Sequence, residues 1–200
     1  MRTMTGSAGL TGLLIVAALA LAPAALAGGA AVGDKAPDFT LPDLKGAQVT
    51  LSKIEGVRVL EWVNPDCPFV QRHYKAGTMK KLAADYAGKG VTWLTINSTN
   101  YMDAEANRKF AEANGLSQRI LVDQDGKVGH LFGAATTPHM FVIDGSGTIV
   151  YAGAIDSDPR GSGGETVTNY VAAALDEVLA GKSVTTPETT PYGCSVKYAK

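Results

Sequence analysis

The chain has 200 residues, a formal net charge of -1, and a content of 46% hydrophobic and 18% charged residues. This composition is that of an ordinary globular protein with enough apolar residues for one core, so a single domain is expected. The charged residues are scattered and form no basic block, which argues against nucleic acid or an anionic membrane surface as the main partner.

An apolar segment stands near the start of the chain. Arg2 precedes an apolar run over residues 10–27, and this run ends in an Ala-Leu-Ala sequence typical of signal-peptide cleavage. Because the run just reaches the length of a membrane span, an uncleaved anchor is the alternative, but Pro23 and the high alanine content favour cleavage. We expect a signal peptide over residues 1–27 and an exported mature protein, periplasmic or extracellular and free of the membrane.

The remaining residues alternate between strand and helix patterns. Short β-branched apolar runs indicate strands, and apolar residues spaced three and four apart indicate helices. The expected strands cover residues 49–51, 57–63, 91–96, 119–122, 139–143 and 148–152, the last two as a hairpin. The expected helices cover residues 68–87 with a bend at Gly77, residues 103–113 with Asp103 as cap, one or two turns over residues 127–132, and an apolar face over residues 167–179. This order predicts an α/β domain.

The sequence EWVNPDCPFV contains the strongest local signal for chemistry. A strand buried on both faces ends in a short loop, and Cys67 directly precedes Pro68, a residue favoured in the first turn of a helix. Free backbone N–H groups and the helix dipole stabilise a thiolate at such a position and so lower the thiol pKa. We therefore expect Cys67 to be reactive; a buried, inert cysteine is the alternative.

The second cysteine of the chain is Cys194. Because thiols can pair in an oxidising compartment, one disulfide is possible, and a structural cross-link is its plainest interpretation. Cys194 lies in a C-terminal segment, residues 183–200, that also contains Tyr192 and Tyr198. These aromatic residues indicate a tail that docks on the domain, although frayed ends are common.

Four stretches of the sequence resemble the thioredoxin superfamily, and more closely its exported redoxins related to alkyl hydroperoxide reductase, thiol-specific antioxidant proteins and cytochrome-maturation thioredoxins. These stretches are VGDKAPDFTLPDLKG, EWVNPDCPFV, TTPHMFVID and GTIVYAGAID. The resemblance implies a thioredoxin-like α/β fold with a central mixed β-sheet flanked by helices. The expected organisation is a signal peptide over 1–27, a redoxin domain over 32–182 and a tail over 183–200.

The resemblance also implies roles for residues around Cys67. In the family a cis-proline follows a threonine and faces the active cysteine, which places Thr137 and Pro138, together with Pro68, beside the substrate. Glu61 matches the buried acid that accepts a proton in thioredoxins, and a carboxyl group in an apolar strand is expected to have a raised pKa. An ordinary trans proline and a carboxylate at a strand edge are the alternatives.

Two departures from the family limit the chemistry. Thioredoxins carry C-x-x-C, but Val70 stands in place of the second cysteine; peroxiredoxins carry P-x-x-x-T-x-x-C, but Leu60 and Asn64 occupy the proline and threonine positions. By resemblance to exported redoxins with a C-terminal cysteine, Cys194 becomes the candidate resolving thiol that closes a bridge to Cys67. A permanent cross-link and two unpaired cysteines stay open as alternatives.

The sequence thus predicts a thiol oxidoreductase in which Cys67 attacks a disulfide or a peroxide, Cys194 resolves the product, and an external thiol or thioredoxin-type donor supplies electrons. The alternatives are a disulfide-linked binding module without activity and a monothiol exchanger of small thiol adducts. We expect no cofactor. His73, His139 and Cys67 are the conceivable metal ligands, as in copper-delivery relatives of this fold. We expect no metal, because those relatives use two close cysteines that this chain lacks, and His73 is interpreted as a solvated residue on an exposed helix face.

Overall fold

The computed structural model describes Met1, residues 29–163 and residues 166–200. The predicted signal peptide lies outside the described residues, apart from Met1. Five strands form the central sheet: β3 (Val57–Trp62), β4 (Val91–Asn97), β5 (Arg119–Val122), β7 (His139–Ile143) and β8 (Ile149–Gly153). Their order is β5-β4-β3-β7-β8, with β3, β4 and β5 parallel and β7 antiparallel to both of its neighbours. The expected mixed sheet is therefore confirmed.

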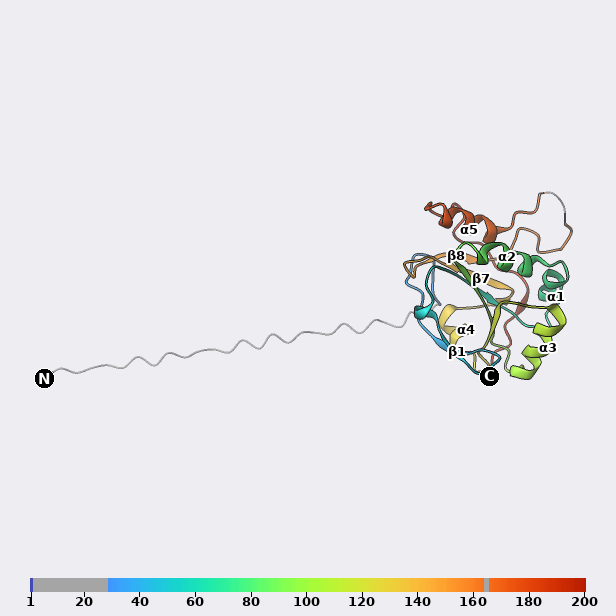
Figure 1. The fold of residues 1–200 in the computed structure, drawn as a ribbon, viewed down its shortest axis with the longest axis horizontal. Helices are drawn as coiled ribbons and strands as arrows, with labels where there is room; N and C mark the ends of the chain where they lie inside the picture. The colour runs from blue at the N-terminus through green and yellow to red at the C-terminus, as the bar shows by residue number, and fades with distance from the viewer. Residues whose placement is uncertain (2–28, 164–165) are drawn as a thin grey trace.

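The helices cover both faces of this sheet. They are α1 (Pro68–Lys75), α2 (Thr78–Ala87), α3 (Ala104–Asn114), α4 (Lys127–Phe132) and α5 (Tyr170–Leu179). Tyr74, Leu82, Phe110 and Leu175 from α1, α2, α3 and α5 pack in one core cluster, whereas Phe132 from α4 packs in the other. Figure 1 shows α5 beside α2 on one side of the domain and α4 on the other. Within the described ranges, none of the helices has the combined length and apolar character needed to cross a membrane.

Strand β3 is buried because its side chains alternate between these two clusters. Val59 faces the cluster beneath α1, and Leu60 faces the cluster beneath α4; both are 0% exposed. Burying one such aliphatic side chain contributes roughly 1.5–3 kcal/mol to the free energy of folding. The central strand thus fixes the position of the loop that follows it.

The helix predicted over residues 68–87 is two helices. Helix α1 ends at Lys75, and Gly77 has a φ of 76° and is the N-cap of α2. A positive φ is available to glycine without steric cost, so the chain stops one helix and starts the next at this residue. The expected bend at Gly77 is therefore a complete break.

Other boundaries differ by one to three residues. The strand expected over 49–51 is β2 (Gln48–Thr50), paired with a strand that the sequence did not predict, β1 (Thr40–Pro42), and Leu51 begins a 3-10 helix, η1 (Leu51–Lys53). Helix α5 begins only at Tyr170, because the Asn169 side chain caps it by accepting a hydrogen bond from the Ala172 N–H. Asp103 caps α3 as predicted.

The tail, residues 183–200, lies along the domain. The Thr189 N–H donates to the Ala152 carbonyl oxygen of β8 at 3.1 Å. Further on, β9 (Cys194–Ser195) pairs antiparallel with β6 (Thr136–Thr137), which is separated by Pro138 from β7, the fourth strand of the central sheet in sequence. The Asn100 N–H also donates to the Lys197 carbonyl oxygen at 2.9 Å, so backbone hydrogen bonds hold the tail at three separate places.

Candidate active site

Cys67 lies at the junction of β3 and α1. It is the N-cap residue of α1, and Pro68 is the first helical residue, a position where the missing N–H of proline leaves no donor unpaired. The Cys67 N–H donates to the Asn64 carbonyl oxygen at 2.9 Å, which closes a tight turn after the strand. The Cys67 side chain and backbone together are only 1% exposed.

The loop that contains Thr137 faces this cysteine. The Thr137–Pro138 peptide bond is cis, as the family resemblance implied. The Sγ atom of Cys67 lies 3.0 Å from the carbonyl oxygen of Thr137, to which its thiol donates a hydrogen bond. The structure thus brings together the cysteine and the threonine–proline pair that the sequence placed at one site.

The tail brings Cys194 to the same place. In the antiparallel pair of β6 and β9, Cys194 lies directly opposite Thr137. This register places Cys194 beside Cys67, and Cys194 contributes to the pKa shift of the Cys67 thiol. The structure contains no disulfide between the two residues.

The two thiols differ in acidity. Burial raises the pKa of Cys67, but hydrogen bonds from Cys194, from Thr137 and from the Val70 N–H outweigh this effect and hold the pKa below the ordinary value. Burial and the adjacent Cys67 sulfur raise the pKa of Cys194 to about 11. Cys67 is therefore the member of the pair that ionises first.

Glu61 is completely buried within β3, on the face covered by α1. Its carboxyl oxygens accept hydrogen bonds from Trp93 Nε1 at 2.7 Å, Tyr74 Oη at 2.9 Å and Thr95 Oγ1 at 3.3 Å. Burial raises the pKa of Glu61 to about 7, although these three hydrogen bonds oppose the shift. In the described part of the chain, none of its hydrogen bonds goes to Cys67, so the structure does not join the acid directly to the thiol.

Tyr192 anchors the tail on one side of Cys194. Its hydroxyl donates to the Asp156 carboxylate and lies 3.1 Å from Nε2 of His73. His73 is only 4% exposed, so the expectation of a solvated histidine is wrong: the ring is buried under the tail. This contact could not be predicted from sequence patterns, because Asp156 and Tyr192 lie far from α1 along the chain.

Tyr198 anchors the tail on the other side. Its ring stacks on His130 with centroids 3.9 Å apart, and its hydroxyl donates to the Ala134 carbonyl oxygen at 2.7 Å. A Cβ atom at Gly129 would lie 2.6 Å from the Cε1 atom of this ring, so α4 needs glycine there to leave room. Asn100 completes the anchor by donating from Nδ2 to the Tyr198 carbonyl oxygen at 2.7 Å.

The histidines considered as metal ligands have other partners. His73 is held by Tyr192, and Nδ1 of His139 accepts a hydrogen bond from the Ala135 N–H at 3.2 Å. Burial lowers the pKa of His139 to about 4. Across the residues that the structure describes, no group of three or more histidine, cysteine and acidic side chains is arranged to hold a metal ion.

An open cleft lies beside the cysteine pair, along the start of α1. It has a volume of about 450 Å³ and is lined by Pro68, Phe69, Arg72, Pro159 and Arg160. The guanidinium carbon of Arg72 lies 5.5 Å from the centre of the Phe69 ring, in a cation–π arrangement. Pro68 thus contributes to an accessible surface next to Cys67.

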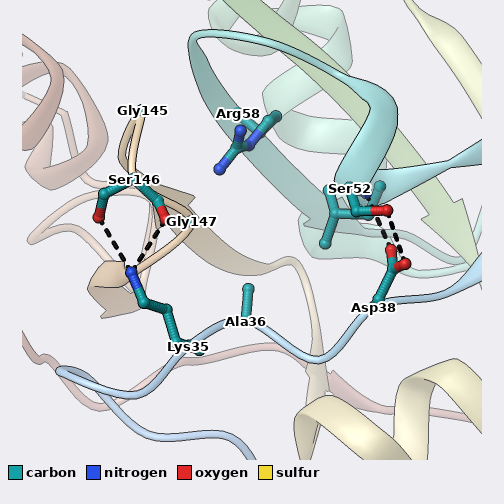
Figure 2. Close-up of a pocket in the computed structure, with 9 residues that line it drawn as sticks. Lys35, Ala36, Asp38, Ser52, Arg58, Gly145, Ser146 and Gly147 are labelled. Carbon is teal, nitrogen blue, oxygen red and sulfur yellow. Dashed lines mark hydrogen bonds between the residues drawn. The ribbon is translucent and has the colours of Figure 1, made fainter.

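A second polar pocket lies at the opposite end of β3, away from the thiols (Figure 2). Figure 2 shows Lys35 bonded to the turn that contains Ser146 and Arg58 pointing toward the same turn. Nζ of Lys35 donates to the Ser146 carbonyl oxygen at 2.9 Å, and Arg58 donates to the carbonyl oxygens of Ile54 and Asp144 at 2.8 and 2.6 Å. These bonds join the start of β3 to the β7–β8 turn, which gives this pocket a structural role.

The sequence profile of the AhpC/TSA family matches residues 32–152 of the chain. The thiol-disulfide oxidoreductase ResA of Geobacillus thermodenitrificans is 33% identical over 121 residues, which cover 60% of this chain and 67% of the relative. A Mycobacterium tuberculosis protein named provisionally as a peroxiredoxin is 30% identical over 132 residues, which cover 60% of this chain and 82% of the relative.

Solved structures with a similar fold also match the chain. A hypothetical protein from Sinorhizobium meliloti has a TM-score of 0.77 and 33% identity, with coverage of 86% of this chain and 97% of that protein. A protein from Chlorobium tepidum, named provisionally as a thiol:disulfide interchange protein of the DsbE type, has a TM-score of 0.55 and 27% identity, with coverage of 62% and 85%. The chain therefore belongs to the AhpC/TSA family and is an oxidoreductase with a thioredoxin-like fold.

Proposed function

We propose that this protein is an exported thiol oxidoreductase in which Cys67 is the nucleophile and Cys194 the resolving thiol. The observation that supports the proposal is the position of Cys194 opposite Thr137, the residue whose carbonyl oxygen accepts a hydrogen bond from the Cys67 thiol. A resolving thiol must reach the sulfur that has reacted, and the tail places Cys194 next to that site. Export is proposed from the apolar N-terminal sequence.

Two oxidants fit this pair. The Cys67 thiolate attacks one sulfur of a disulfide, the S–S bond breaks, and the other sulfur leaves as a thiolate. Alternatively, the Cys67 thiolate attacks a hydroperoxide, the O–O bond breaks, an alcohol or water leaves after protonation, and Cys67 becomes a sulfenic acid. In both cases the Cys194 sulfur then attacks the Cys67 sulfur and gives up its proton. The bond from Cys67 to the substrate sulfur or to the hydroxyl oxygen breaks, a thiol or water leaves, and a Cys67–Cys194 disulfide forms.

An external thiol or thioredoxin-type donor then reduces this disulfide. Cys194 is partly exposed whereas Cys67 is buried, so we expect the donor thiolate to attack the Cys194 sulfur. This attack releases Cys67, the sulfur with the lower pKa and hence the better leaving group. A second donor thiol frees Cys194, and the donor is oxidised to a disulfide.

The other predicted site residues have supporting roles. Thr137 and Pro138 lie against the Cys67 sulfur, and Pro68 lines the adjacent cleft, so these three residues are proposed to contact the substrate. Glu61 is proposed as an indirect proton acceptor, because its pKa of about 7 allows proton exchange near neutral pH while its hydrogen bonds go to other residues. A disulfide-linked binding module is not favoured, because the relatives are named as a thiol-disulfide oxidoreductase and, provisionally, a peroxiredoxin.

Peptide mapping after mild oxidation tests the proposal. The reduced mature protein is mixed with one equivalent of hydrogen peroxide or of a small disulfide, quenched by alkylation and digested. We expect loss of two hydrogen atoms and a single cross-linked peptide that joins Cys67 to Cys194 and disappears with dithiothreitol. The variant Cys194→Ser should stop at a sulfenic acid or mixed disulfide on Cys67, whereas the matched control Ser195→Ala should form the bridge.

Two results would count against this cycle. A Cys67–Cys194 bridge that is present before oxidation and resists mild reductant would identify a permanent cross-link. Oxidation of Cys67 without any bridge in the unmodified protein would instead identify a monothiol exchanger, in which Cys194 takes no part.

A further inference from the structure

The tail occupies a backbone edge beside the reactive cysteine. Strand β6 pairs Thr136 with Ser195 and Thr137 with Cys194, and the Val196 N–H extends the pairing by donating to the Ala135 carbonyl oxygen at 3.1 Å. An unpaired strand edge of this kind is a template on which an extended peptide can add as a further strand. In this protein, the chain's own tail takes that place.

The tail lies very close to the loop with the cis peptide bond. Gly193 has a φ of +136°, and a Cβ atom at this position would lie 2.1 Å from the carbonyl oxygen of Thr137. Only glycine allows such an approach together with this φ. With β9 docked, Cys67 is 1% exposed, and the tail occupies the paired edge of β6.

We infer that the docked tail makes the reduced protein selective for low-molecular-weight oxidants over polypeptide disulfides, with Tyr192 and Tyr198 as the specificity-determining anchors. This inference rests on the proposed Cys67–Cys194 cycle. A hydroperoxide or a small aliphatic disulfide must contact only the Cys67 sulfur, so a slight outward shift of β9 is enough to admit it. A polypeptide disulfide has backbone on both sides of the reacting sulfur. This backbone must pair with the β6 edge, so it displaces Cys194 from its position opposite Thr137.

The same anchors keep the resolving thiol in place. When a polypeptide disulfide reacts in a protein with a released tail, the Cys67 thiolate attacks one peptide sulfur and the other peptide sulfur leaves as a thiol. Resolution of the mixed disulfide is then slow, because Cys194 no longer lies opposite Thr137. Release of the tail should therefore speed the first step with a polypeptide and slow the second step with every oxidant.

Three variants of the full mature chain separate these effects. Tyr198→Ala removes the ring stacked on His130 and the hydrogen bond to Ala134. Asn100→Ala weakens the same anchor from the domain side and leaves the tail sequence unchanged. Tyr198→Phe keeps the stacked ring and is the matched control. Circular dichroism establishes that each variant is folded.

The test measures the second-order rate of Cys67 oxidation by alkylation and mass spectrometry, with hydrogen peroxide, 2-hydroxyethyl disulfide and an unstructured peptide containing one disulfide. Because both ring stacking and a hydrogen bond are lost, Tyr198→Ala should raise the rate with the peptide by about tenfold, and Asn100→Ala should raise it less. The ratio of the first-step rates with the two small oxidants should change by less than about twofold, because any change in the Cys67 thiolate affects both rates alike, and Tyr198→Phe should lie close to the unmodified protein.

Equal peptide rates in the unmodified protein and in both release variants would overturn the selectivity and leave the redox cycle intact. Failure of the small oxidants to form the Cys67–Cys194 bridge in the unmodified protein would instead overturn the proposed function on which the selectivity rests. A peptide that oxidises the unmodified protein as fast as 2-hydroxyethyl disulfide does would also contradict the inference.

Discussion

Replacement of Cys67 by serine is expected to abolish oxidant turnover and leave the fold intact. Serine has nearly the volume of cysteine, its hydroxyl can donate to the Thr137 carbonyl oxygen that now accepts from Sγ at 3.0 Å, and serine is a favoured N-cap residue for α1. The free energy of unfolding should therefore change by less than about 1 kcal/mol. A serine hydroxyl is not ionised near neutral pH and forms no sulfenic acid, so the first redox step has no nucleophile.

Peroxide consumption with dithiothreitol as the electron donor measures this loss, and thermal unfolding measures the stability of the same samples. Cys194→Ser is the informative companion, because it retains the nucleophile and should oxidise once before it stalls. Turnover by Cys67→Ser comparable to that of the unmodified protein would place the nucleophile elsewhere. A large fall in melting temperature would show that Cys67 is needed for packing as well as for chemistry.

The location of this nucleophile could be predicted from the sequence because all of its determinants are local. A run of apolar, β-branched residues fixes β3, Pro68 fixes the start of α1, and the two elements leave Cys67 between them. The hairpin of β7 and β8 and the cap of α3 by Asp103 depend in the same way on residues within a few positions. Strand β1 was missed because it ends at Pro42 within an entry segment rich in Pro, Gly and Asp, a composition typical of a loop.

The anchors of the tail could not be predicted in this way, because each joins residues far apart in the sequence. The ring of Tyr198 packs against Gly126 and Gly129. Gly126 also has a φ of 72° at the start of α4, whereas Gly129 has an evident reason only when the tail is in place. Gly129 lies inside α4, where glycine is normally unfavourable. A glycine inside a short helix was thus the one signal in the sequence that another segment approaches there.

Glu61 and His139 should make large and opposite contributions to the pH dependence of stability. The pKa is raised from 4.5 to about 7 in the folded protein, mainly by burial, so between these values the folded state holds a proton that the unfolded state has released. Stability should therefore fall as pH rises from about 4.5 to about 7, by about 3 kcal/mol in total from this group. His73 and His139 should instead make stability rise as pH rises, because burial lowers the pKa of each in the folded protein.

Comparison of the unmodified protein with Glu61→Gln isolates the contribution of this carboxyl group. Glutamine has no charge at any pH, so the variant should lose the fall in stability and keep the opposing effect of the histidines. It also leaves one of the donors Trp93 and Tyr74 without an acceptor, which should cost about 1–3 kcal/mol at pH 5. Denaturant unfolding of the reduced proteins at pH 5, 6, 7 and 8 measures both effects, with Glu112→Gln on the exposed face of α3 as control.

The expected result is two stability curves that converge as pH rises and a control curve that follows the unmodified protein. Parallel curves for Glu61→Gln and the unmodified protein would mean that Glu61 is ionised throughout, and that Trp93, Tyr74 and Thr95 stabilise its charge more than burial opposes it. In that case Glu61 would have no proton to exchange near neutral pH. The stability measurement therefore also decides whether this residue can serve as the proton acceptor of the redox cycle.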